Sequence, residues 1–277
     1  MQKILAVSGG VDSMVLLDLF KNDPQAVVAH FNHGSRPSAD ADQLFVAAVA
    51  KKYNLPFFTA KQTLGSQVSE AKAREARYAF LFQVAKTQNG QIYTAHHLDD
   101  LIESVVINFI RGTSWRGLAP LNNPDLARPL IAKNFFRADV LRYAAQHQIS
   151  YRQDPTNTEL NYLRNRLRPL CSNLPPNQKN TLINLVNRQK NLAAEISKIL
   201  QTLQPSDGIY QRAWFETLDS SVSIELLRFA LLNNRQLSLT RPQLLDFLSA
   251  IKTYQPDKNF NLPRSNFVKI HKNFFQL

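Results

Sequence analysis

Six residues near the N-terminus, Ser8-Gly-Gly-Val-Asp-Ser13, have the composition of a loop that binds phosphate. Two adjacent glycines let the backbone turn tightly and approach a ligand closely, because glycine has no Cβ atom. If a helix begins here, its first amides and its dipole favour an anion, and the two serine hydroxyls add donors. The segment lacks the Gly-Lys-Ser/Thr of a Walker A loop and the Gly-x-Gly-x-x-Gly of a dinucleotide fingerprint. An ordinary strand–helix turn, in which Asp12 or Ser13 only caps the helix, is the alternative.

A second group of polar residues lies at His96-His-Leu-Asp-Asp-Leu-Ile-Glu103. Asp100 and Glu103 are three residues apart, so on a helix their carboxylates share one face. Such a pair suits an ammonium group, whose proton one carboxylate helps to remove before nucleophilic attack. A Mg²⁺ site or a solvated acidic face remains open. His96 and His97 lack a third nitrogen or sulfur ligand, so we exclude zinc and interpret His96 as an orienting or substrate-contacting residue.

These two groups need elements that bring them together, and the first half of the chain supplies an alternating pattern. Short runs rich in β-branched or aromatic residues alternate with segments whose apolar residues recur at helical spacing. We expect strands at Ile4–Val7, Ala26–Phe31, Pro56–Ala60, Gln91–Ala95 and Arg128–Ile131, and helices at Asp12–Lys21, Ala39–Asn54, Ser69–Asn89, Asp99–Arg111 and Arg137–Gln148. This alternation predicts an α/β fold with a doubly wound, mostly parallel five-stranded sheet. Such sheets bind ligands at the carboxyl ends of their strands, which both polar groups follow.

The pattern changes after Ser150. Helical spacing predominates there, and we expect helices at Leu163–Leu170, Asn177–Leu203, Ser223–Leu232 and Arg241–Tyr254, with a terminal hairpin at Phe260–Leu277. The paired prolines of Leu174-Pro-Pro-Asn177 stop a helix and stiffen a connection. The sequence therefore predicts a first domain of residues 1–174 and a second, smaller, mostly helical domain of residues 175–277.

The chain has 277 residues, with 33 Lys and Arg against 21 Asp and Glu, and its formal net charge is +12. Between Glu159 and Glu195 there is no acidic residue, and this stretch contains Arg164, Arg166, Arg168, Lys179, Arg188 and Lys190. A nucleic acid would account for such a stretch, although a solvated basic face would also do so. The single cysteine, the absence of a long apolar run and a strand-like N-terminus without a leader predict a cytoplasmic protein with no membrane contact.

The loop Ser8–Ser13 resembles the signature of the PP-loop ATP pyrophosphatases. Further stretches together resemble the tRNA(Ile)-lysidine synthetases within that family, in the family's order over residues 1–170. They are His30–Arg36, Glu70–Tyr78, His96–Glu103, Arg111-Gly-Thr, Arg128-Pro-Leu130, Asp154–Asn157 and Arg164–Arg168. Two departures are minor: Ser35 replaces a usual aliphatic residue and Ser104 a usual threonine. The region that follows is shorter than in the family's long members.

The resemblance implies a reaction in two steps. ATP, bound with Mg²⁺, adenylates the wobble cytidine of the CAU anticodon of tRNA(Ile) at its C2 oxygen and releases pyrophosphate. L-lysine then displaces AMP, and the product, lysidine, changes the codon read from AUG to AUA. The resemblance also makes a homodimer an expectation.

The same resemblance assigns roles to individual residues. It implies that ATP is bound by Ser8, Gly9, Gly10, Val11, Asp12 and Ser13. It implies catalytic roles for Asp12, Arg36, Arg74, Arg77, His96, Asp100, Glu103 and Arg111, and no metal-ligating residue of the protein's own. Lysine is assigned to Asp100 and Glu103, and the tRNA backbone to Arg164 and Arg168. For Arg74 and Arg77, ion pairs with Glu70 or Glu75 on the same helix are the alternative.

Other kinds of protein fit the residues less well. A tRNA 2-thiolating PP-loop enzyme generally needs cysteines to carry sulfur or a cluster, and Cys171 lies outside the matched motifs. A PP-loop ligase of small molecules, such as one that makes an amide of NAD, leaves the stretch without acidic residues unexplained. A non-catalytic RNA-binding module has no use for an intact Ser8–Ser13 loop with Asp100 and Glu103.

Overall fold

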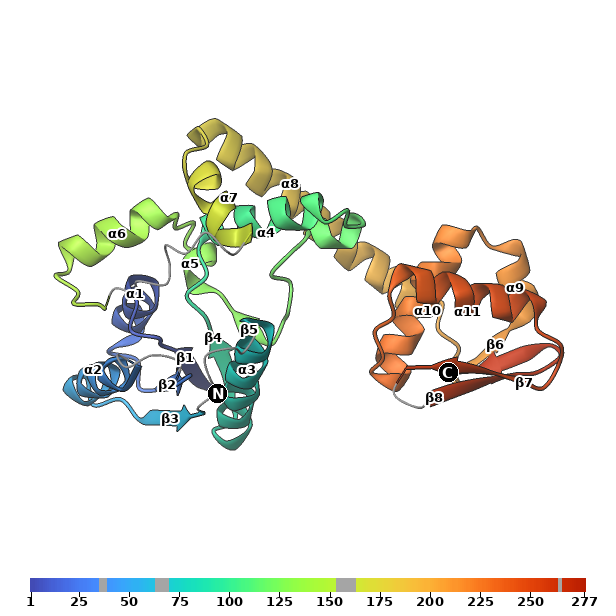
Figure 1. Cartoon of the computed structure of the whole chain (residues 1–277), viewed down its shortest axis with the longest axis horizontal. Helices are drawn as coiled ribbons and strands as arrows, with labels where there is room; N and C mark the ends of the chain where they lie inside the picture. The colour runs from blue at the N-terminus through green and yellow to red at the C-terminus, as the bar shows by residue number, and fades with distance from the viewer. Residues whose placement is uncertain (35–38, 63–69, 153–162, 264–265) are drawn as a thin grey trace. The chain divides into compact units, whose positions relative to one another are not determined.

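Strands and helices alternate through the first half of the computed structural model, which describes residues 1–34, 39–62, 70–152, 163–263 and 266–277. The described chain divides into two units, Met1–Gln189 and Lys190–Leu277 (Figure 1). The strands of the first unit are β1 (Gln2–Ala6), β2 (Ala26–Asn32), β3 (Phe57–Lys61), β4 (Gly90–Tyr93) and β5 (Leu126–Ala127). Its helices are α1 (Val11–Phe20), α2 (Ala39–Lys52), α3 (Glu70–Thr87), α4 (Leu98–Ile110), α5 (Pro129–Ala132), α6 (Arg137–Gln146), α7 (Leu163–Ser172) and the start of α8 (Pro176–Thr202), with a short 3₁₀ helix at Trp115–Leu118.

The described strands of the first unit form a five-stranded sheet in the order β3-β2-β1-β4-β5, with every pairing parallel. The chain moves outward from β1 to β3, then returns to place β4 on the other side of β1. The predicted doubly wound α/β fold is confirmed. Because the order of the strands reverses between β1 and β4, the crevice at their carboxyl ends is the expected ligand site.

Apolar side chains on both faces hold the helices against this sheet. Leu81 and Val84 of α3 pack with Ile4 of β1 on one face, while Met14 of α1 and Val46 of α2 belong to the cluster on the other face. Figure 1 shows α3 on the opposite side of the sheet from α1 and α2. The strand β2, which lies between two neighbours and is covered on both faces, is buried at all but one residue and begins with a continuous apolar run.

One predicted strand is wrong. Residues Arg128–Ile131 do not form a strand: β5 ends at Ala127, and Pro129 begins the short helix α5. Proline has no N–H to give to a sheet, whereas its fixed φ suits the first turn of a helix. The apolar residues of this segment favoured a strand, but in so short a segment the spacing of apolar residues cannot distinguish a strand from a helix.

The two units divide within helix α8, later than the predicted boundary between residues 174 and 175. Pro176 is the first residue of α8 rather than part of a linker, in agreement with the preference of proline for the first helical turn. Ile183 and Val186 of α8 pack with Leu101 and Ile102 of α4, so this part of the helix belongs to the first unit.

The second unit combines helices with an antiparallel sheet. It contains β6 (Ile209–Gln211), α9 (Arg212–Thr217), α10 (Ser220–Arg235), α11 (Arg241–Thr253), β7 (Lys258–Leu262), β8 (Asn266–Ile270) and β9 (Phe274–Gln276). The described strands pair in the order β6-β9-β8-β7. The terminal segment predicted as a hairpin therefore contributes three strands, and β6 joins them from a distant position that alternation alone cannot identify.

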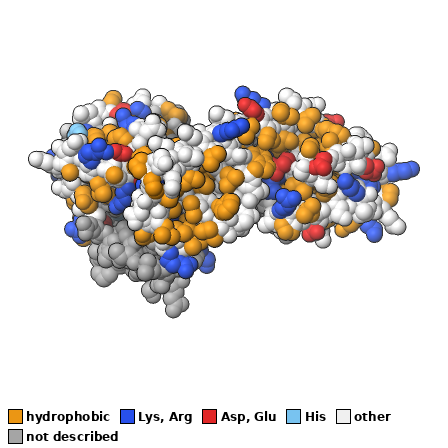
Figure 2. Space-filling view, turned by 90° about the horizontal axis from the view of Figure 1, so that it is seen from above, with side chains coloured by type: hydrophobic (Ala, Val, Ile, Leu, Met, Phe, Trp, Pro, Cys, Tyr) orange, Lys and Arg blue, Asp and Glu red, His pale blue; other side chains and the backbone are white. Residues whose placement is uncertain are grey.

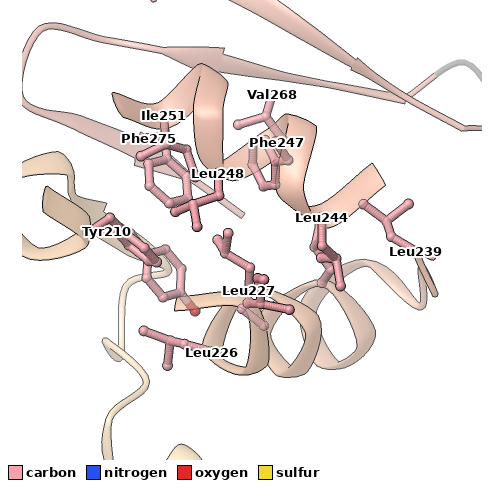
Figure 3. Close-up of a cluster of buried hydrophobic side chains, with 14 of the residues drawn as sticks. Tyr210, Leu226, Leu227, Leu239, Leu244, Phe247, Leu248, Ile251, Val268 and Phe275 are labelled. Atoms are coloured by element: carbon pink, nitrogen blue, oxygen red, sulfur yellow. The ribbon is translucent and has the colours of Figure 1, made fainter. Parts of the chain in front are cut away.

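Buried aromatic and leucine side chains form the core of the second unit (Figure 3). Phe275 of β9 lies between Tyr210 and Phe247, with ring centroids 5.4 and 5.8 Å away. Leu227 of α10 and Leu244 of α11 are fully buried in the same core. Among the described residues, no helix combines the length and the apolar character needed to span a bilayer.

Candidate active site at the carboxyl ends of β1 and β4

The loop after β1 is closed by hydrogen bonds to one buried side chain, Ser13. Its Oγ accepts from the backbone N–H groups of Ser8 and Gly9, at 3.1 Å each, and donates to the carbonyl of Gly10 over 2.8 Å. Gly9 has φ +94°, a conformation that favours glycine, and Gly10 caps α1. We expected both serine hydroxyls to serve as phosphate donors. The structure shows Ser13 Oγ engaged within the loop, while Ser8 is exposed.

A distant segment also holds this loop, through Arg152. The backbone N–H of Arg152 donates to the carbonyl of Gly9 over 2.9 Å. Its guanidinium Nε donates to the buried carboxylate of Asp42 on α2, at 3.1 Å. Arg152 therefore links α2 to the loop. The sequence gives no signal for this role, because no local pattern of residues links Arg152 to Gly9 or Asp42.

Asp12, in the first turn of α1, forms an ion pair with Arg137 of α6. Both of its carboxylate oxygens accept from Arg137 Nη1 at 3.0 Å. The backbone N–H of Arg137 donates to Asp99 over 2.7 Å, and Lys179 of α8 donates to the other oxygen of Asp99, also over 2.7 Å. Asp99 is only 3% exposed. This network connects the loop to α4 and α8, and the sequence analysis missed both Arg137 and Lys179.

His96 lies at the carboxyl end of β4 in an environment that keeps it neutral. Burial lowers the pKa of His96 to about 4; the charge of Asp100 partly opposes this shift, and Arg128, Arg164 and Arg74 add to it. Its Nδ1 shares a hydrogen bond of 2.9 Å with the hydroxyl of Thr94. The ring is therefore fixed in orientation and a weak base, in agreement with an orienting or substrate-contacting part rather than with general-base catalysis.

The neighbours of Asp100 favour its charged form. Burial alone disfavours the charge of Asp100, but His97, His96 and Arg164 outweigh it, and the pKa of Asp100 is lowered. The backbone N–H of His97 donates to Asp100 over 3.0 Å, at the first turn of α4. Glu103 is only 2% exposed. The two carboxylates lie on the same side of α4, facing α7.

Arg164 and Arg168 of α7 reach these carboxylates. Arg164 Nε donates to Glu103 Oε2 over 2.9 Å, and its Nη2 lies 3.4 Å from Asp100 Oδ1. Arg168 Nε donates to Glu103 Oε1 over 3.1 Å. From the family resemblance we expected the carboxylates to bind lysine and the arginines to bind tRNA; the four side chains lie in one cluster.

The other arginines of the sequence analysis lie outside that cluster or outside the described residues. Arg36 is not among the described residues. Arg74 and Arg77 lie against the ring of Tyr78 on α3, at 4.8 and 5.5 Å from its centroid. Arg111 is exposed just after the end of α4, about 12 Å along the helix axis from Glu103. The structure thus brings Arg74 near His96 but does not bring Arg111 to the carboxylates.

The described residues contain no group of three or more His, Cys, Asp or Glu side chains arranged for a metal ion. Cys171 is buried, and burial raises the pKa of its thiol. A thiol in such surroundings is a poor nucleophile, because the thiolate is the reactive form.

Comparison with known protein families matches the first part of the chain. A family model described as a PP-loop domain matches residues 1–174, which include the loop, both histidines, the carboxylate pair and α7. The chain belongs to the PP-loop family.

Relatives of this PP-loop protein include tRNA(Ile)-lysidine synthases. The one from Thermus thermophilus is 39% identical over an alignment of 192 residues, which covers 65% of this chain and 37% of that protein. The one from Persephonella marina is 36% identical over 201 residues, covering 66% and 44% of the two chains. The chain thus spans less than half the length of these two relatives.

A solved structure supports the fold. The U34-tRNA thiolase NcsA from Methanococcus maripaludis, with its 4Fe–4S cluster, superimposes with a TM-score of 0.55 and 18% identity. It covers 69% of this chain and 72% of its own. At this identity the likeness extends to the fold alone.

Proposed function

We propose that this PP-loop protein ligates L-lysine to C2 of the wobble cytidine in the CAU anticodon of tRNA(Ile), through an adenylated cytidine. The observation that carries the proposal is the position of the Asp100–Glu103 pair beside the phosphate-binding loop, at the carboxyl ends of adjacent strands. Relatives named tRNA(Ile)-lysidine synthase support it with 32–39% identity over most of the chain.

In the first step, the loop Ser8–Ser13 holds the phosphates of ATP. The first amides of α1 and the helix dipole attract the pyrophosphate, and the hydrogen bonds of Ser13 keep the loop in the required shape. Mg²⁺ bound with ATP would neutralise the negative charge that develops on pyrophosphate as it leaves.

In the second step, a lysine amine attacks C2 of the cytidine and AMP leaves. Asp100 and Glu103 hold a lysine ammonium group, and one of the two carboxylates accepts the proton whose removal makes the amine nucleophilic. His96, which is neutral, orients the substrate by its ring rather than by charge.

The tRNA contacts the stretch without acidic residues between Glu159 and Glu195. Figure 2 shows Lys and Arg side chains spread over the visible face, separated by hydrophobic surface, with no dense acidic patch on its left side. A polyanion is attracted to such a distribution, because each neutralised phosphate releases counterions. We also propose that the protein is cytoplasmic and that it forms a homodimer. Sedimentation measurements test the homodimer.

The test is incubation with ATP, labelled L-lysine and individual tRNAs, followed by analysis of the nucleosides. Lysine enters only the tRNA(Ile) with the CAU anticodon, and the methionine tRNA with the same anticodon stays unmodified. In a parallel incubation with ATP, tRNA and sulfide in place of lysine, sulfur incorporation favours the thiolating alternative. Lysine transfer without tRNA favours a small-molecule ligase. Either result overturns the proposal.

A further inference from the structure

Arg164 occupies the place that a lysine ammonium group needs, and this inference rests on the proposed function. Its guanidinium lies between the carboxylates of Glu103 and Asp100, at 2.9 Å from the first and 3.4 Å from the second. A guanidinium and an ammonium are both cations that only donate hydrogen bonds. The protein's own side chain therefore makes the contacts that a lysine ammonium group makes in the proposed reaction.

The charges of the cluster already balance, so a further cation would have no carboxylate to neutralise it. Two carboxylates, Asp100 and Glu103, face two guanidiniums, those of Arg164 and Arg168, so the cluster is neutral. The side chains of Glu103 and Asp100 are only 2% and 14% exposed. An added ammonium group would bring an uncompensated positive charge into a region from which water is largely excluded, which is costly. One guanidinium must leave before lysine binds.

The contacts identify which guanidinium leaves. Arg168 reaches Glu103 Oε1 alone, whereas Arg164 contacts oxygens of both carboxylates. Withdrawal of Arg164 frees Glu103 Oε2 and Asp100 Oδ1 together, and an ammonium group with three N–H donors uses both. Arg168 meanwhile keeps Glu103 in place. We propose that Arg164 is an internal competitor of lysine, and that lysine binds only after the Arg164 side chain has moved away.

The tRNA supplies the alternative partner for Arg164. This residue lies in the stretch without acidic residues, and its side chain is 30% exposed, so a phosphate can reach it. Arginine binds phosphate through two parallel, charge-assisted hydrogen bonds. Binding of tRNA draws Arg164 from the carboxylates and opens the lysine site. The competition thus orders the substrates, with tRNA before lysine.

Equilibrium dialysis of the full chain against radiolabelled L-lysine tests this, with α,β-methylene ATP present so that no adenylate forms. For the wild type, addition of the CAU tRNA(Ile) tightens lysine binding by at least about tenfold, the effect of removing one charge-assisted competitor. Arg164→Gln binds lysine without tRNA about as tightly as the wild type binds it with tRNA, and tRNA adds nothing further.

Arg241→Gln is the matched control, since it removes the same charge from an exposed position on α11, outside the stretch assigned to tRNA. Without tRNA it binds lysine as the wild type does. Two results overturn the inference: Arg164→Gln binds lysine no more tightly than the wild type, or tRNA leaves wild-type lysine binding unchanged. The second result uses only the wild-type protein, so it tests the inference even if the Arg164→Gln variant does not fold. Failure of the proposed function is distinct, because then the wild type transfers no lysine to tRNA when ATP is supplied.

Discussion

At the scale of single residues, Ser13 illustrates how a short side chain shapes the loop that follows β1. Its hydroxyl group accepts from two backbone N–H groups of the loop and donates to a carbonyl. In Ser13→Ala these groups lose their partner, so we expect the free energy of unfolding to fall by about 1–2 kcal/mol. We also expect the KM for ATP to rise by roughly tenfold, since a looser loop loses preorganisation.

Pyrophosphate release at varied ATP concentration measures this KM. Ser197→Ala is the control, because the Ser197 hydroxyl only donates to the Ala193 carbonyl along α8. An unchanged KM for ATP in Ser13→Ala, with the control also unchanged, contradicts the role given to Ser13.

His96 makes the first unit sensitive to acid. Burial holds the folded pKa of His96 at about 4, below the 6.5 of an ordinary histidine, so between these values only the unfolded chain binds the proton. The contribution to stability is complete above about pH 6.5 and is lost as the pH falls toward 4. Acidification from about pH 7 to about pH 4.5 therefore lowers the free energy of unfolding by about 2 kcal/mol.

Urea unfolding at the two pH values measures this in the wild type and His96→Asn. A Trp214→Phe background leaves Trp115 as the fluorescent reporter in the first unit. The His96→Asn variant should lose about 2 kcal/mol less stability on acidification than the wild type. Equal losses would show that the proton uptake lies elsewhere.

At the scale of elements, one buried ion pair ties α8 to α4. Lys179 Nζ lies 2.7 Å from Asp99, and their side chains are 14% and 5% exposed. Lys179→Met leaves Asp99 with fewer partners inside the protein, so we expect a loss of about 3 kcal/mol in the free energy of unfolding. Asp99 also binds the N–H of Arg137, so the helices around the loop loosen together.

Thermal and urea unfolding check this expectation, with Lys198→Met as the control at an exposed position of the same helix. The control changes stability by less than about 0.5 kcal/mol. If Lys179→Met is as mild as the control, the pair does not hold α8 in place.

The elements also show how far sequence reasoning reaches. Alternation of strands and helices predicts the parallel sheet, and the position of Ser8–Ser13 at the junction of β1 and α1 follows from it. Helical spacing places Asp100 and Glu103 on one face, but it does not say which element packs opposite. The partners Arg164 and Arg168 lie 61 and 65 residues further along from Glu103, so only tertiary packing reveals the pairs.

At the scale of the whole molecule, the net charge of +12 predicts that tRNA binding depends strongly on salt. Each phosphate neutralised by Lys or Arg releases counterions, so affinity falls with ionic strength. We expect the affinity for tRNA to drop by at least about tenfold between about 50 and about 200 mM salt. Filter binding across this range measures the slope, and a flat response is incompatible with an electrostatic contact along the stretch between Glu159 and Glu195.

The central claim is that the loop after β1 binds the terminal phosphates of ATP, so that AMP can be transferred to a nucleobase. A crystal structure with α,β-methylene ATP tests it most directly. The account predicts β and γ phosphates within hydrogen-bonding distance of the amides of Gly9, Gly10 and Val11, with the α phosphate facing the crevice between β1 and β4. Nucleotide bound elsewhere, with these amides free of phosphate, would contradict it.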